Sequence, residues 1–170
     1  MICSKETCLK TAYLALGSNI GDREGNLRDA VKRLEADDLR ITRRSSLYET
    51  APQELLDQPW FLNAVVQIET SLFPLQLLAR ARGIEREMGR RRVAPKGPRN
   101  IDIDILFYGR AVIAAAELEV PHPRIAQRRF VLEPLAEVAP DFRHPLTGKT
   151  AGEMLTALEQ QGVRKLAIGL

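Results

Sequence analysis

The chain has 170 residues, which is long enough for a single domain (1–170) with a hydrophobic core. Its hydrophobic share of 45%, its charged share of 28% and its net charge of +3 are typical of a soluble globular protein, and no apolar run of about 18 residues predicts a transmembrane helix. The first residues lack a basic leader followed by an apolar stretch and a cleavage site, so we expect a cytoplasmic protein without a membrane partner.

The predicted elements begin after an N-terminal extension (1–10), whose order or disorder the sequence leaves open. Cys3 and Cys8 in this extension indicate two reduced thiols, because no Cys/His cluster accompanies them to form a metal site. The segment TAYLAL (11–16) predicts the first strand. A Gly/Ser/Asn turn then leads to a helix that Asp22 can cap and that runs to about residue 36.

Two strands and a loop follow. The segment LRITRRSSLYET (39–50) indicates an edge strand, and APQELLDQP (51–59) indicates a loop between two prolines. The segment WFLNAVVQIET (60–70) predicts a core strand, because alternate residues of a strand share a face and one of its faces is wholly apolar. The apolar face consists of Leu62, Ala64, Val66 and Ile68, and the mixed face consists of Phe61, Asn63, Val65 and Gln67.

The second half of the chain begins with a predicted helix from Pro74, which suits a first turn, to Met88, with Gly89 as a natural end. The segment GPRNIDIDILFYG (97–109) predicts the next strand. The remaining predictions are a strand within 111–120, a loop over 121–130, a short helix over 131–141, and a helix over 150–162 that opens with a Thr150/Glu153 capping box.

The order of these elements is β-α-β-β-α-β-β followed by helices. Its first six elements match the split βαβ, ferredoxin-like pattern. We therefore expect an α+β fold, a ferredoxin-like α/β sandwich in which an antiparallel sheet has helices packed on its faces, with the two helices of the six-element pattern on one face. The opposite face would hold Phe61, Asn63, Asp102 and Asp104.

Asp102 and Asp104 raise the question of how two carboxylates can lie in an otherwise apolar strand. Alternation places the isoleucines of this strand on one face and the two aspartates on the other, about 7 Å apart at the backbone. A Mg²⁺ ion, which takes one or two carboxylates and completes its shell with water and phosphates, would offset their repulsion. The alternative is a pair of exposed aspartates on a polar sheet face, paired with Arg99.

The segment from Arg80 to Arg99 holds eight basic and two acidic residues. This local positive charge suits an anionic partner such as nucleic acid or a nucleotide phosphate, although a solvated helix end would have the same composition. The GKT at 148–150 lacks the glycine that a P-loop needs five residues earlier, so ATP would bind through side chains. His122, which three arginines follow within one loop, is either a phosphate contact or a structural histidine.

Taken together, these motifs resemble those of a known family. Six segments have the order and near-constant spacing of the motifs of 6-hydroxymethyl-7,8-dihydropterin pyrophosphokinase over about residues 12–160: ALGSNIGDR, LYETAP, DQPWFLNAVVQIET, IEREMGRRR, GPRNIDIDIL and VPHPRIAQRRFVLEPLAEVAP. The resemblance implies an ATP- and Mg²⁺-dependent diphosphotransferase of folate biosynthesis. Such an enzyme transfers pyrophosphate from ATP to the hydroxymethyl group of 6-hydroxymethyl-7,8-dihydropterin and releases AMP. It also implies a monomer.

The resemblance further implies roles for single residues. The Asp-x-Asp pair of the family binds two Mg²⁺ ions that bridge the ATP phosphates, which makes Asp102 and Asp104 the expected metal ligands. With Arg90 and Arg92 they form the expected catalytic set. The expected ATP contacts are Glu85, Arg90, Arg92, Arg99, Ile105, His122 and Arg128. The expected pterin contacts are Thr50, Pro52, Phe61, Asn63, Asp102 and Phe130.

In the family, an asparagine recognises the pterin and two aromatic rings stack on it. Asn63 matches the asparagine and Phe130 matches one ring, whereas the other ring is expected in or near the first long loop, where this chain has no clear counterpart. The Arg-rich loop also departs from the commonest family form: it is one residue shorter, and Lys96 stands where an aromatic residue often precedes Gly-Pro-Arg.

Two functions of other classes stay open on the residues alone. One is a ferredoxin-like RNA-binding module that uses the basic segment, although only 5% of the residues are aromatic and no aromatic pair of the base-stacking kind lies within a strand. The other is a Mg²⁺-dependent nucleotide-binding regulator without catalysis. We expect ATP and the pterin as partners and no nucleic acid.

Overall fold

One large sheet runs through the computed structural model of the chain, which describes residues 9–53, 56–90 and 97–170. Its strands are β1 (Lys10–Ser18), β2 (Leu39–Arg44), β3 (Ser46–Thr50), β4 (Phe61–Thr70), β5 (Asp102–Tyr108) and β8 (Val163–Gly169). They pair in the order β5-β1-β4-β3-β8, and β2 also pairs with β4. All these pairings are antiparallel. The order of the first strands is that of the predicted ferredoxin-like pattern.

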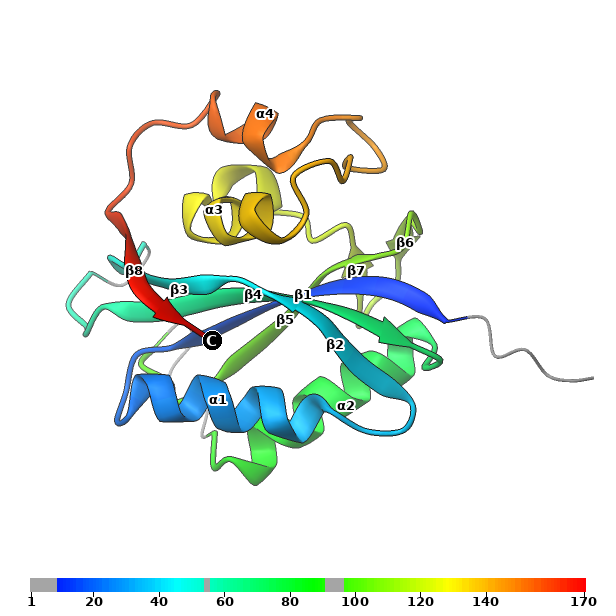
Figure 1. Ribbon diagram of the computed structural model, residues 1–170, viewed down its shortest axis with the longest axis horizontal. Coiled ribbons are helices and arrows are strands. Elements are labelled where there is room, and N and C mark those ends of the chain that lie inside the picture. Colours follow the sequence, from blue (N-terminus) through cyan, green and yellow to red (C-terminus); the bar gives the residue numbers. More distant parts are fainter. Residues whose placement is uncertain (1–8, 54–55, 91–96) are drawn as a thin grey trace, which may run out of the picture.

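Helices cover both faces of this sheet (Figure 1). They are α1 (Arg23–Leu34), α2 (Pro74–Glu87), α3 (Arg129–Val138) and α4 (Ala151–Leu155), and a 3-10 helix η1 (Ile125–Gln127) precedes α3. α1 and α2 lie on one face, whereas α3 lies on the other face with α4 packed beyond it (Figure 1). The predicted α/β sandwich is therefore confirmed.

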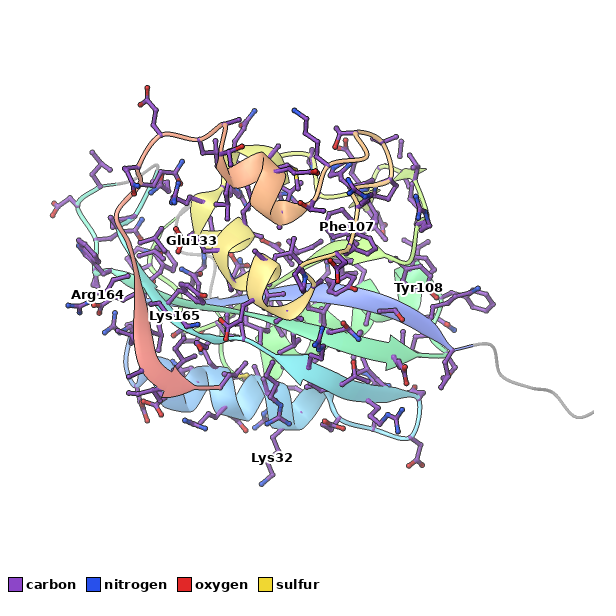
Figure 2. All side chains as sticks on the ribbon, turned by 45° about the horizontal axis from the view of Figure 1, so that its top comes forward. Lys32, Phe107, Tyr108, Glu133, Arg164 and Lys165 are labelled. Atoms are coloured by element: carbon purple, nitrogen blue, oxygen red, sulfur yellow. The ribbon has the colours of Figure 1, made fainter. Side chains whose placement is uncertain are left out.

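The face under α1 and α2 holds the larger hydrophobic cluster. The predicted apolar face of β4 is buried there, as are Ile101, Ile103 and Ile105. The helices contribute residues at helical spacing, such as Leu27, Val31 and Leu34 of α1. Lys32 extends from the opposite side of α1, away from the sheet (Figure 2). Alternation thus predicted correctly which side of each central strand is buried here.

The predicted start of α1, both ends of α2 and the predicted start of α4 are confirmed to within one residue. The backbone N–H of Gly25 donates to the Asp22 carboxylate at 3.0 Å, which caps α1. α2 begins at Pro74, and Gly89 just after it has a φ of +78°, the left-handed conformation that glycine adopts without strain. The Thr150/Glu153 capping box also forms. However, α4 ends at Leu155 rather than near residue 162.

The face under α3 holds a second cluster, which a β-bulge in β5 makes possible. Tyr13 pairs with Phe107 and Leu14 pairs with Ile105, so that one extra residue of β5 lies between the two pairs. As a result Leu106 and Phe107, neighbours in the sequence, both pack in the cluster under α3. The other members include Tyr13, Val65, Val131, Leu132, Leu135, Val138, Ala151 and Met154.

Three strand predictions need correction. The predicted strand 39–50 is divided at Ser45, whose backbone N–H and side-chain oxygen both hydrogen-bond to Val65 at 2.9 Å, and both halves pair with β4. The strand predicted within 111–120 is a short hairpin of β6 (Ile113–Ala114) and β7 (Glu119–Val120). The sequence analysis missed β8, a mostly exposed strand that pairs with β3 at the sheet edge.

Candidate active site

A cavity of about 370 Å³ lies beside the cluster under α3, a size within the range of small-molecule sites. Residues of β1, β4 and β5 form its floor, and the loop after β3, the segment 122–128 and the start of α3 form its walls. The predicted site residues that line it are Thr50, Pro52, Phe61, Asn63, Arg90, Arg99, Asp102, Asp104, His122, Arg128 and Phe130. Most of the predicted site is therefore brought together in one place.

Gly17 forms the centre of the floor. The strand register places it opposite Asn63 of β4 on one side and opposite Asp102 of β5 on the other. A Cβ atom on this residue would lie 2.8 Å from Oδ1 of Asn63, closer than real contacts allow. Glycine at this position therefore leaves room both for the Asn63 amide and for the cavity above it.

Asp102 is held between two arginines. Its Oδ1 lies 2.7 Å from Nη1 of Arg90, and its Oδ2 lies 3.0 Å from Nε of Arg99. Arg90 also forms an ion pair with Glu85. The Arg99 Nε atom is buried, and its contact with Asp102 is an ion pair without the alignment of a hydrogen bond. A guanidinium held beside a polar cavity in this way can serve as a donor for an anionic ligand.

Asp104 lies one alternate position further along β5 and faces the cavity. Nη1 of Arg128 lies 3.8 Å from its Oδ2. Burial of the carboxylate between the cavity walls, together with the neighbouring Asp102, raises the pKa of Asp104, while Arg128 and the other arginines oppose this effect. Arginines thus partner both aspartates, as the alternative interpretation of the sequence predicted for Arg99.

The donor set fits a magnesium ion that shares its shell with phosphates. Asp102 and Asp104 offer hard oxygen ligands from one face of one strand. Among the described residues, no group of three or more His, Cys, Asp or Glu side chains could hold a metal by itself. Magnesium is typically bound by only one or two carboxylates, with water and substrate phosphates completing the shell, so two aspartates suit it when a nucleotide is present.

The other end of the cavity combines an amide with aromatic rings. Asn63 is buried, and its Nδ2 donates a hydrogen bond of 2.6 Å to the hydroxyl of Thr50, which is also buried. Phe61 and Phe130 are the aromatic residues among the described cavity lining. The Arg99 guanidinium lies 5.1 Å from the ring centre of Phe61, so Phe61 of β4 is a second phenylalanine ring beside Phe130 at this end of the cavity.

Asn19 supports the site from behind the cavity lining and was not predicted from the sequence. It is 1% exposed, and its Nδ2 donates to the side chain of Gln58 and to the Pro59 carbonyl, each at 3.0 Å. Its Oδ1 accepts from the backbone N–H of Arg99 at 2.8 Å. Asn19 therefore joins the loop before β4 to the segment before β5. Its partners lie up to 80 positions away in the sequence, and no local sequence pattern predicts them.

His122 lines the cavity as an uncharged imidazole. Burial, followed by the nearby Arg128 and Arg124, lowers the pKa of His122 to about 4. Its Nδ1 accepts a hydrogen bond of 3.2 Å from the backbone N–H of Arg124. Near neutral pH the remaining nitrogen, Nε2, is therefore an N–H donor.

Two predicted residues that the structure describes, Glu85 and Ile105, are not among the residues that line the cavity. Glu85 lies behind it, 7% exposed, where its Oε1 accepts from the backbone N–H of Ile103 at 2.8 Å and pairs with Arg90; burial raises the pKa of Glu85. Glu85 thus orients Arg90. The side chain of Ile105 packs in the core under α1 and α2, so its predicted ATP contact would come only from the backbone. Arg92 lies outside the described residues.

The surroundings of the sheet bear on the RNA-binding alternative. Modules of that kind stack bases on an exposed sheet face. Here α1 and α2 cover one face, and α3 with the cavity walls covers the other (Figure 1). A base-stacking platform is therefore not available on the described part of the sheet. No helix in the described ranges is long and apolar enough to cross a membrane.

Residues 13–140 match the family model described as 7,8-dihydro-6-hydroxymethylpterin-pyrophosphokinase. The 2-amino-4-hydroxy-6-hydroxymethyldihydropteridine pyrophosphokinase of Bacillus subtilis is 46% identical over 154 residues, which are 90% of this chain and 88% of the relative. The protein of the same name from Methylorubrum extorquens is 45% identical over 156 residues, which are 91% of this chain and 98% of the relative.

In longer relatives, the region similar to this chain is one part of the protein. The folic acid synthesis protein fol1 of Pneumocystis carinii is 45% identical over 139 residues, and the match covers 82% of this chain but 19% of that protein. Among solved structures, the wild-type HPPK-DHPS of Plasmodium falciparum with pteroate has a TM-score of 0.71 at 18% identity, over 88% of this chain and 42% of that chain. At that identity the likeness shows the fold, which agrees with the α+β sandwich described above.

Proposed function

The chain belongs to the 7,8-dihydro-6-hydroxymethylpterin-pyrophosphokinase family, and we propose that it transfers a pyrophosphoryl group from ATP to the hydroxymethyl group of 6-hydroxymethyl-7,8-dihydropterin in folate biosynthesis. The observation that carries this proposal is the composition of the cavity. An amide and two aromatic rings lie at one end, and two aspartates among three arginines lie at the other. These are the groups that a planar pterin and a magnesium-bound triphosphate require.

The pterin end acts by shape and hydrogen bonding. A flat heterocycle fits between aromatic rings, which here would be Phe61 and Phe130, and its donor and acceptor edge matches the two ends of the Asn63 amide. The hydrogen bond to Thr50 fixes the orientation of that amide before the substrate arrives. Pro52 forms a wall beside it. A preorganised amide of this kind discriminates against ring systems that lack the matching edge.

The phosphate end acts by an exchange of ionic partners. In the structure Arg90 and Arg99 contact Asp102, and Arg128 contacts Asp104. The triphosphate of ATP offers these arginines another anionic partner, with Arg92 and His122 as further contacts. Asp102 and Asp104 would then be free to hold two Mg²⁺ ions, which supply charge neutralisation when bound.

The transfer itself needs alignment more than covalent help. Because AMP leaves, the pterin hydroxymethyl oxygen forms its new bond to the β-phosphorus of ATP. The bond from that phosphorus to the oxygen shared with the α-phosphate breaks, AMP departs with the electron pair, and the hydroxyl proton is lost to water. Arg90, Arg99 and Arg128 stabilise the charge that moves onto the phosphate oxygens.

The remaining parts of the proposal concern the setting of the enzyme. We propose ATP as the nucleotide, a monomer as the active form, a cytoplasmic location and no nucleic-acid partner. The chain spans about a fifth of the length of the fol1 and bifunctional relatives and most of the length of the bacterial ones, so the activity proposed concerns this domain alone.

The test is an assay of the purified chain with ATP, Mg²⁺ and 6-hydroxymethyl-7,8-dihydropterin. We expect AMP and the pterin diphosphate in equal amounts, and no AMP when either the pterin or Mg²⁺ is left out. ADP as the nucleotide product, or ATP binding without turnover, would contradict the proposal. Tight and salt-sensitive binding of RNA without turnover would favour the RNA-binding alternative instead.

A further inference from the structure

Two consecutive residues of the C-terminal segment, Gln161 and Gly162, contact both walls of the substrate cavity. They lie between α4 and β8, where the chain descends past α3 toward the sheet edge (Figure 1), and outside the residues 13–140 that match the family model. Gln161 contacts the wall that carries Arg128, whereas Gly162 contacts the wall that carries Thr50. Neither residue lines the cavity itself among the described lining.

The side-chain amide of Gln161 hydrogen-bonds to the backbone on both sides of Arg128. Its Oε1 accepts a hydrogen bond of 3.0 Å from the backbone N–H of Arg129, and its Nε2 donates one of 3.2 Å to the carbonyl oxygen of Gln127. The two partners need opposite ends of the amide, so the pair fixes its orientation. Both backbone groups flank the residue whose guanidinium lies 3.8 Å from Asp104.

The first of these hydrogen bonds also caps α3. Arg128 is the residue before the helix, and its side chain makes no capping hydrogen bond. Arg129 is the first helical residue, and its N–H is one of the groups that a helix start leaves without a partner. Gln161 supplies that partner from 32 positions further along the chain. The direction in which α3 begins, and with it the position of Phe130, is therefore coupled to Gln161.

Gly162 holds the opposite wall by its backbone. Its carbonyl oxygen accepts a hydrogen bond of 2.8 Å from the backbone N–H of Ala51, which lies between Thr50 and Pro52. A Cβ atom on Gly162 would lie 3.0 Å from Cβ of Ala51 and 3.7 Å from the Trp60 ring. Glycine therefore permits a close approach that a larger residue would push apart.

We propose that Gln161 is a positioning residue of the substrate cavity, which together with Gly162 fixes the spacing between the Arg128/Phe130 wall and the Thr50/Pro52 wall. This inference rests on the proposed function, because that function assigns Thr50, Pro52 and Phe130 of the two walls to the pterin and Arg128 to the ATP phosphates. The other two described arginines assigned to the phosphates, Arg90 and Arg99, are held by Asp102 rather than by Gln161 or Gly162. Loss of the Gln161 and Gly162 contacts should therefore weaken binding of the pterin more than binding of MgATP.

The test compares Gln161→Met, which keeps the length of the side chain but loses both hydrogen bonds, with Gln161→Glu, which keeps an acceptor for the Arg129 N–H. For Gln161→Met we expect the KM for the pterin to rise about 5- to 30-fold, the effect of losing a helix cap, with a smaller rise in the MgATP dissociation constant because Arg90 and Arg99 keep their contacts. Gln161→Glu should restore most of the affinity, because a carboxylate is also favourable at a helix start. Gln160→Met, at the exposed preceding residue, serves as the matched control and should change neither constant.

A second measurement separates this inference from the proposed function. Hydrogen exchange of the Arg129 amide, followed by NMR without substrates, should become faster in Gln161→Met and stay slow in Gln161→Glu and in the control. If the wild-type protein formed no AMP but this exchange changed as expected, the proposed function would fail while the cap would stand. A Gln161→Met variant with an unchanged pterin KM, or with a lowered melting temperature as its sole defect, would overturn the positioning role.

Discussion

Two halves of one sheet face have opposite contents in this protein. Under α3 the face is filled: Tyr13, Val65 and Phe107 pack against the helix and are almost fully buried. Further along each strand toward the cavity, the same face carries Asn63, Gly17 and the two aspartates and is open. The backbone is continuous through both halves, so the side chains alone decide where the sheet is core and where it is a site.

The side chains of the central strand β1 show how this sheet face changes from core to cavity. On the face toward α3, β1 presents Tyr13, then Ala15, then Gly17, so its side chains become smaller by steps toward the cavity. The flanking strands supply the polar groups, Asn63 from β4 and Asp102 from β5. The decrease in size along one strand creates the space, and its neighbours provide the chemistry.

The largest effect, a loss of kcat, is expected from substitutions in the open half that lines the cavity. Asp102→Ala and Asp104→Ala should each lower kcat by about 10³-fold, the scale on which a main electrostatic group of an active site acts. The fold should persist in both, because these side chains face the cavity rather than the apolar core. Rates of AMP formation, with circular dichroism as the check on folding, measure this. Near-normal turnover of either variant would show that the metal assignment is wrong.

Substitutions in the filled half under α3 should lower the stability of the protein rather than its activity. Leu135 of α3 is 1% exposed, and Leu135→Ala should lower the free energy of unfolding by about 2–5 kcal/mol through the cavity that it leaves. The KM values of the folded enzyme should stay near those of the wild type. Urea denaturation measures the first quantity, and Leu75→Ala, at a residue that is 53% exposed, is the control. A loss of pterin affinity without a loss of stability would show that the two halves are not separable.

Gly17→Ala tests the boundary between the halves. The added methyl group would lie 2.8 Å from Oδ1 of Asn63, so the amide must move. We expect the dissociation constant of the pterin to rise about 10- to 100-fold, equivalent to roughly 1–3 kcal/mol of overpacking. Isothermal titration with the pterin measures this. Gly83→Ala, at a helix position where the new methyl group meets nothing within 4 Å, is the control and should not weaken binding. Unchanged pterin binding in Gly17→Ala would mean that the size gradient along β1 is not what shapes the site.

The smallest effect concerns Glu137, at the end of α3 far from the cavity. Burial would raise the pKa of Glu137, but hydrogen bonds from Ser46 and Tyr48 outweigh burial and lower it. A lowered folded-state pKa means that the stabilisation is present above the unfolded-state pKa and is lost as the pH falls through the folded-state pKa.

The wild type should therefore exceed Glu137→Gln by about 1 kcal/mol in free energy of unfolding at pH 7. This difference should shrink as the pH falls below the ordinary pKa of a glutamate, about 4.3. Urea denaturation at several pH values measures it, with catalytic constants near pH 7 unchanged. A difference that stayed constant at low pH would remove the ionised carboxylate as its cause.

Strand alternation was sufficient to predict the faces of the sheet. It assigned Ile103 and Ile105 to the core and the two aspartates to the opposite side, and the buried clusters agree. Two helix starts were also predictable, because the cap at Asp22 and the first-turn proline Pro74 depend only on residues next to them in the sequence. The identity of the substrate was not predictable from such patterns, and it came from the resemblance of whole motifs to a family.

The features that escaped prediction depend on distant partners. Asn19 stands in an ordinary turn sequence, and it supports the site only because Gln58 and Arg99 meet it in the fold. β8 is mostly exposed and has a weak apolar pattern, so only its pairing with β3 makes it a strand. The arginine partners of Asp102 are likewise a property of the fold, since Arg90 reaches it from beyond α2.

The bulge in β5 has a consequence for tolerance to changes in chain length. In a regular strand, the loss of one residue turns every later side chain to the opposite face. Here Leu106 is the extra residue, with Ile105 before it in the core under α1 and α2 and Phe107 after it under α3. Its deletion would leave a regular strand in which Asp102 and Asp104 still face the cavity and Phe107 still faces α3. The strand that carries the aspartates can therefore vary in length by one residue without inverting either of its ends.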